Sequence, residues 1–173
     1  MSNLSSLLDT LRRTREKLTA AARAVSDQHW RVPPRTDAWS AAEVVAHITM
    51  VETLMTGAAA KITRKPAVRV PVWNRIHLPV VVASWRILRV KSPIPLDMLL
   101  LDDRDIMLSR LAEQRYRTIS VLEAGRESNF RNHRINHPLL GSLHYYDWFR
   151  TLANHDLRHE KQLREIVRTC QGA

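Results

Sequence analysis

Apolar residues recur along this chain at steps of three, four and seven, a spacing that places them on one face of a helix. The pattern fills four segments that contain no proline, namely 1–32, 35–65, 96–137 and 139–173. Proline inside a helix costs about 3 kcal/mol, so helices are expected to run between the prolines. Four amphipathic helices of roughly two dozen residues are best buried against one another. The sequence therefore predicts an all-α fold, a four-helix bundle.

The start of the second helix is marked by two overlapping signals. Ser40 and Glu43 have the spacing of a capping box, in which Ser40 is the N-cap and Glu43 is the third helical residue. Trp39 and Val44 then fall at the two positions of a hydrophobic staple. We expect the second helix to begin directly after Ser40.

The third and fourth helices have weaker end signals. The third is expected to begin at Asp102 or Asp103 and to end near Gly125. Ser142, which follows a glycine, is a candidate N-cap for the fourth helix. No strand-like alternation of comparable length and no internal repeat is present.

The stretch from about residue 66 to 96 departs from the helical pattern. It holds five of the eight prolines and two apolar patches, around 70–73 and 78–87. We expect a long crossover between the second and third helices that carries one short helix, at about 80–90. Connections of this length are uncommon unless they have a function. Its tryptophans and valines favour packing on the bundle over a free linker.

Length and composition set the class of protein. A chain of 173 residues fits one domain, here 1–173 with 66–96 inserted as the crossover. A single cysteine, Cys170, cannot form an internal disulfide, which suits a reducing compartment, and we regard it as incidental. The N-terminus lacks the pattern of a signal peptide, and the longest apolar stretch is far below the roughly 20 residues that span a bilayer. We therefore expect a cytoplasmic protein with no transmembrane segment.

Three of the eight histidines lie on apolar helix faces. His155 and His159 are one turn apart in the fourth helix, and His47 lies between Val44 and Val51 in the second. Histidines at i and i+4 present two nitrogens to one point, and a third from a facing helix completes a metal site with positions open for water or substrate. The alternative is a set of core imidazoles that hydrogen-bond to their neighbours. The spacing alone leaves both readings open.

The remaining histidines are weaker candidates. His137 stands in a His-Pro-x-x-Gly turn and is expected to pack at the end of the bundle rather than act near a metal. The other four are expected to be surface or loop residues: His29, His77, His133 and His144.

No carboxylate is an obvious general base. Glu52 lies about 140° around the helix from His47, where a solvated or inter-helix salt bridge is expected. Glu43 is on the same face as His47, but its place in the capping box explains it. Catalytic residues therefore stay unassigned, which argues against a self-sufficient hydrolase.

Three pieces of the sequence, in this order, carry a resemblance to a known family. They are AWSAAEVVAHI at 38–48, HPLLG at 137–141 and NHDLRHEKQ at 154–162. Together they resemble the DinB-like family of damage-inducible-type four-helix bundles with a metal site. The resemblance implies an up-down-down-up bundle and a divalent metal, zinc or nickel, with His47, His155 and His159 as its ligands. It also implies dimerisation through bundle faces and relatives that act with low-molecular-weight thiols, although the crossover here is longer than usual in the family.

The net charge of +10 comes mainly from one window. No acidic residue occurs between Glu52 and Asp97, whereas eight basic residues lie within 61–91. The alternatives are a solvated loop without a partner, a channel for an anionic substrate, a nucleic-acid surface and contact with an acidic membrane. We expect a small-molecule substrate, a low-molecular-weight thiol or an anionic compound, in preference to nucleic acid.

Two functions remain open on the sequence. The first is a divalent-metal-dependent enzyme, a thiol-dependent transferase or a hydrolase, because a metal held by three neutral imidazoles lowers the pKa of a bound water or thiol. The second is a non-catalytic, metal-stabilised helical module whose basic crossover binds an anionic partner such as nucleic acid.

Overall fold

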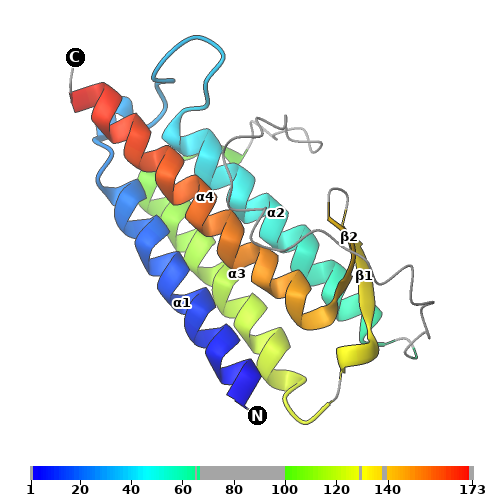
Figure 1. Cartoon of the computed structure of the whole chain (residues 1–173). Coiled ribbons are helices and arrows are strands. Elements are labelled where there is room, and N and C mark those ends of the chain that lie inside the picture. The colour runs from blue at the N-terminus through cyan, green and yellow to red at the C-terminus, as the bar shows by residue number, and fades with distance from the viewer. Residues whose placement is uncertain (1, 65, 67–99, 129, 138–139, 172–173) are drawn as a thin grey trace.

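Four long helices make up most of the protein. The computed structural model describes residues 2–64, 66, 100–128, 130–137 and 140–171. The helices are α1 (Ser2–Arg23), α2 (Ala41–Ile62), α3 (Arg104–Ala124) and α4 (Tyr145–Gln171), and they lie side by side in a bundle (Figure 1). Short 3-10 helices follow α1 and α3, at Asp27–His29 and Phe130–Asn132. The predicted all-α four-helix bundle is confirmed.

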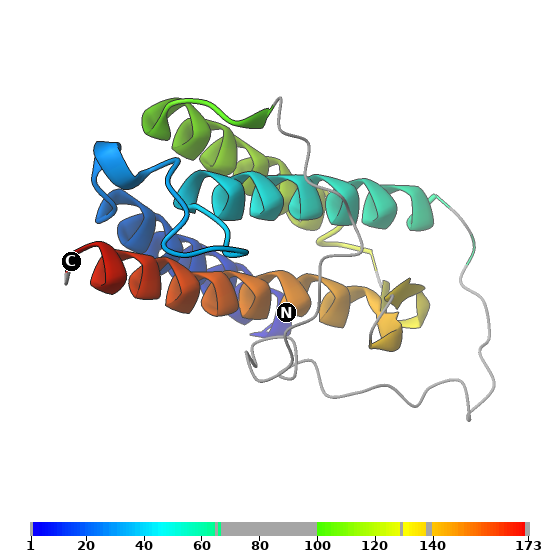
Figure 2. The same cartoon turned by 90° about the horizontal axis from the view of Figure 1, so that it is seen from above.

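The helices run up, down, down and up. In Figure 1, α1 and α4 rise from the end marked N toward the end marked C, whereas α2 and α3 run the opposite way. Figure 2 shows α4 alongside α1 and α2 alongside α3, and α2 also packs on α4. Because α2 and α3 are parallel, the chain has to return along the bundle between them. The predicted crossover, with its short helix at 80–90, lies almost wholly outside the described residues.

The predicted start of α2 and both predicted ends of α3 are confirmed. Ser40 Oγ accepts a hydrogen bond from the Glu43 amide at 3.3 Å, and Glu43 Oε2 accepts one from the Ser40 amide at 2.7 Å. Asp103 is the N-cap of α3, and Gly125 is its C-cap.

The start of α4 corrects the sequence-based prediction. Ser142 is not an N-cap, because it lies in a strand, and α4 begins at Tyr145. Strands β1 (Arg134–His137) and β2 (Gly141–His144) pair antiparallel in a small hairpin. Two strands of four residues are too short to produce a recognisable alternation in the sequence. The left-handed backbone of Gly141, with φ of 82°, is a conformation that glycine adopts without strain.

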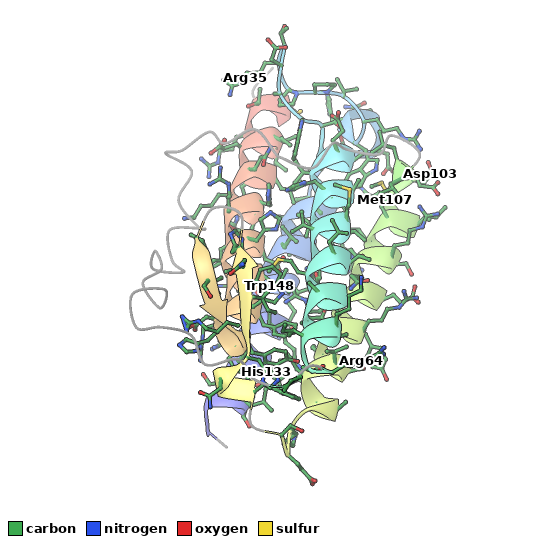
Figure 3. All side chains as sticks on the ribbon, turned by 90° about the vertical axis from the view of Figure 1, so that its right-hand side faces the viewer. Arg35, Arg64, Asp103, Met107, His133 and Trp148 are labelled. Carbon is green, nitrogen blue, oxygen red and sulfur yellow. The ribbon has the colours of Figure 1, made fainter. Side chains whose placement is uncertain are left out.

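The core consists of two apolar clusters separated by a layer of buried polar side chains. The first cluster includes Val44, Ile48 and Met107, and the second includes Leu8, Phe149 and Trp148. Figure 3 shows Met107 nearer the end with Asp103 and Trp148 nearer the end with His133. The polar layer, which every helix contributes to, consists of Thr14, Arg15, Glu52, Gln114, Arg115, Thr118 and Asp156. None of the described helices is both long and apolar enough to cross a membrane.

Candidate metal centre

The three histidines of the apolar helix faces meet at one point. His47 Nε2 lies 3.2 Å from His155 Nε2, which lies 3.1 Å from His159 Nε2. One nitrogen from each residue can be chosen so that all three lie within 4.8 Å of one another. His47 and His159 are buried, and His155 is partly buried. The histidines therefore form a group that could hold a metal ion.

Helix geometry explains why these side chains converge. His155 and His159 are separated by one turn of α4, so their rings lie one above the other, with centroids 4.4 Å apart. His47 lies in the second turn of α2, whose start is fixed by the capping box at Ser40. Because α2 packs on α4, the three rings face each other across that contact, and the His47 centroid is 5.2 Å from each of the other two.

Hydrogen bonding alone does not satisfy this arrangement. A neutral imidazole has one N–H and one lone pair on its two nitrogens. His159 Nδ1 lies 2.9 Å from Gln162 Oε1, an acceptor, so Nδ1 carries the proton and Nε2 presents its lone pair to His155. His155 Nε2 lies between the lone pair of His159 and His47 Nε2. This nitrogen carries either one hydrogen or one lone pair, so it can form a hydrogen bond with only one of its two neighbours. A cation among the three nitrogens would accept all three lone pairs.

Burial favours the neutral imidazole that metal ligation needs. Burial, together with the positive charge of Arg158, lowers the pKa of His47 to about 4. Burial also lowers the pKa of His155 well below its usual value, and His159, His47, Arg15 and Arg158 add to the effect. Both rings are therefore neutral at physiological pH, with lone pairs available for a cation.

Two neighbours of the group were not found from the sequence. The Trp39 ring, held just before the N-cap of α2, lies 4.9 Å from the His47 ring and covers one side of it. Gln162 bonds to His159 from the next turn of α4. In the sequence, Gln162 is marked by its place three residues after His159, and Trp39 by its place directly before the N-cap Ser40. Neither spacing is distinctive enough to predict these contacts.

The other described histidines lie away from this group. His137 Nδ1 accepts a bond from the Leu140 amide at 3.2 Å, and its ring packs on Trp148, which agrees with the expected place in a turn. His133 and His144 belong to the hairpin region, and His29 belongs to the 3-10 helix after α1. His77 lies outside the described residues.

Glu52 forms a buried inter-helix salt bridge instead of a solvated one. Arg115 Nε donates to Glu52 Oε1 at 2.8 Å, and Arg15 Nη2 also donates to this carboxylate. The same two guanidinium groups reach Asp156 on α4, each through an Nη2 bond of 3.0 Å. We call Arg15, Glu52, Arg115 and Asp156 the charge cluster. In the sequence, Arg15 and Arg115 each follow a core leucine by four residues, at Leu11 and Leu111, but an arginine that only covers an apolar face has the same spacing.

The charge cluster predicts how stability depends on pH. Burial alone would raise the pKa of Glu52, but the charges of Arg15 and Arg115 and hydrogen bonds from Arg115 and Thr118 outweigh it, and the net effect lowers the pKa. A carboxyl whose pKa is lower in the folded than in the unfolded state stabilises the fold above its unfolded pKa, about 4.3. We expect this stabilisation to be lost as pH falls below that value, as measured by urea unfolding between pH 7 and 3. The variant Glu113→Gln, which removes an exposed carboxylate, should leave the curve unchanged. A Glu52→Gln variant whose curve also matches the wild type would contradict the prediction.

The family model of the DinB superfamily matches residues 10–163, which covers all three histidines and the charge cluster. No curated protein matches the chain.

Proposed function

Because the chain belongs to the DinB superfamily and its three inward-facing histidines meet at one point, we propose that it is a divalent-metal protein with His47, His155 and His159 as the ligands. The observation that carries this proposal is the position of His155 Nε2, which has a second imidazole nitrogen at 3.1 Å and a third at 3.2 Å. Two nitrogens bound to one ion at about 2.0 to 2.1 Å are separated by about 3.0 to 3.4 Å, so the spacing fits zinc or nickel. His47 Nδ1, buried without a hydrogen-bond partner among the described residues, leaves Nε2 as the nitrogen directed to the site.

We further propose that the site serves a thiol-dependent transferase reaction in preference to hydrolysis. A divalent cation held there would supply Lewis acidity that makes a thiol or a water molecule easier to deprotonate. Among the described residues, no carboxylate joins the histidine group. The nearby carboxylates of Glu52 and Asp156 are both paired with arginines, so neither is available to take a proton from water. A thiol has a much lower pKa than water and needs no such base.

Metal titration tests the first part of this proposal. Chelator-treated protein without a His tag should take up one equivalent of zinc or nickel per chain, and its thermal stability should rise with metal concentration. Uptake below a tenth of an equivalent would overturn the assignment.

For the thiol-dependent reaction, cobalt-loaded protein is titrated with glutathione, and a new sulfur-to-cobalt charge-transfer band is expected in the near ultraviolet. A spectrum that stays unchanged at millimolar glutathione would contradict thiol binding at the metal.

Gln162 provides a separate prediction for the same site. Its side-chain oxygen accepts the Nδ1 proton of His159, which holds the ring with Nε2 toward the other histidines. We expect Gln162→Leu to weaken zinc binding about 10- to 100-fold, as measured by competition with a chromophoric chelator. Gln28→Leu, at an exposed position after α1, is the matched control and should bind zinc as the wild type does. Equal affinities for the two variants would show that this hydrogen bond does not orient His159.

The second candidate is a non-catalytic, metal-stabilised module whose basic segment 61–91 binds an anionic partner. Its support is the run without acidic residues between Glu52 and Asp97. On this hypothesis, metal removal lowers thermal stability, no thiol chemistry occurs, and binding to duplex DNA weakens steeply with salt. The absence of DNA binding at low salt would remove nucleic acid as the partner.

Dimerisation, which the family resemblance implies, is tested by sedimentation at micromolar concentration.

A further inference from the structure

The charge cluster joins the same two helices that carry the three histidines. His47 and Glu52 are both on α2, and His155 and Asp156 are adjacent on α4. The two carboxylates are bridged by guanidinium groups from α1 and α3. Every member is almost fully buried, with side-chain exposure between 0% for Glu52 and 7% for Arg15. All four helices are therefore tied together beside the histidine group.

The bonds of the cluster are directional and leave little freedom. Arg115 Nε and Nη2 donate to the two oxygens of Glu52 at 2.8 and 3.2 Å, in the forked geometry that a guanidinium and a carboxylate prefer. Arg15 Nε and Nη2 donate to the two oxygens of Asp156 at 3.2 and 3.0 Å in the same way. Thr118 Oγ1 adds a bond to Glu52 Oε1 at 2.7 Å. A shift of one helix by a single residue, about 1.5 Å with a 100° rotation, would break these bonds.

Stability alone does not account for four buried charges. Apolar residues of similar size often give equal or greater stability at such positions, because charges lose their hydration on burial. The apolar clusters on either side of the polar layer already hold the helices together, but apolar contacts tolerate small sliding and rotation. Three nitrogens that bind one ion do not tolerate such helix movements, because the distances from a metal to its ligands are defined to about 0.2 Å.

We propose that Arg15, Glu52, Arg115 and Asp156 are positioning residues that hold α2 and α4 in the register at which His47 meets His155 and His159. This inference rests on the proposed metal site. The proposed effect on metal affinity comes from helix position rather than from the electric field that Arg15 also exerts on His155. Loss of either sign of charge therefore has the same consequence, a loosened register and a weaker metal site.

The test compares zinc affinity in two charge-removing variants of opposite sign. Glu52→Gln and Arg115→Gln should each weaken zinc binding about 10-fold or more in chelator competition, and each should alter the visible spectrum of cobalt-loaded protein. An effect of the electric field alone would weaken binding in Glu52→Gln but strengthen it in Arg115→Gln, and that result would overturn the proposal. Affinities within twofold of the wild type in both variants would also overturn it.

Two further variants separate positioning from general destabilisation. Leu7→Ala shortens a buried side chain on α1, which carries none of the three histidines, and it should lower stability without changing zinc affinity. If Glu52→Gln or Arg115→Gln does not fold, Thr118→Val removes one donor to Glu52 with a smaller loss of stability, and about a threefold weaker affinity is expected. An unchanged affinity in Thr118→Val would then count against the proposal. If the wild-type protein binds no zinc, the metal site itself is refuted. If wild type and variants bind zinc equally, the metal site stands and the positioning role of the charge cluster is refuted.

Discussion

His155→Ala is expected to abolish metal retention, leaving less than a tenth of an equivalent of zinc on the purified protein. His155 is the histidine whose Nε2 lies within 3.2 Å of both other nitrogens, so its loss removes the centre of the group. The two histidines that remain come from different helices and form an incomplete set. The loss should exceed the 10- to 100-fold effect of removing an outer hydrogen-bond partner. Elemental analysis of dialysed protein and chelator competition measure it.

The control for this variant is another histidine removed from the same chain. His29→Ala deletes a ring that bonds to Ser26 in the segment after α1, outside the three-histidine group, and it should retain a full equivalent. Full metal retention by His155→Ala would refute the ligand assignment.

Glu52→Ala should lower the free energy of unfolding by about 3 to 5 kcal/mol, the usual cost of removing one partner from a buried ion pair. Glu52 is fully buried and accepts bonds from Arg15, Arg115 and Thr118. Its removal leaves two buried guanidinium groups with only Asp156 between them, and the desolvation of the arginines is no longer offset. Urea unfolding of metal-free protein measures the change without a contribution from metal binding.

An exposed ion pair provides the comparison. Glu113 pairs with Arg117 on the outer face of α3, where both side chains are largely in water, and Glu113→Ala should change stability by less than about 0.5 kcal/mol. Equal unfolding curves for Glu52→Ala and Glu113→Ala would show that Glu52 does not offset the burial of the two arginines.

Much of the bundle could be predicted from the sequence because helix periodicity and helix caps are local signals. The capping box at Ser40 and Glu43 and the ends of α3 were read from spacings of a few residues. The convergence of His155 and His159 follows from one helical turn, and their meeting with His47 follows once α2 and α4 are in contact.

The charge cluster could not be predicted in the same way, because its partners are far apart in the chain. Glu52 bonds to residues 37 and 63 positions away, and no local pattern distinguishes an arginine that will be buried from one that covers an apolar face with its stem. The hairpin before α4 was missed for a different reason. Its two strands have four residues each, too few for a recognisable alternation, and the residue taken for a cap, Ser142, lies in the second of them.

Because α2 and α3 are parallel, the helix order sets a minimum length for the connection between them, but it does not set the charge of that connection. The chain must travel back along the bundle between Ile62 and Arg104, a distance of about 30 Å for helices of this length. About 10 residues in extended form cover that distance, so most of the connection exceeds what the topology requires. Seven basic residues therefore lie in a connection that is longer than the helix order requires. We expect a shortened connection to remove these basic residues while the histidines and the charge cluster, which lie on the four helices, keep their places.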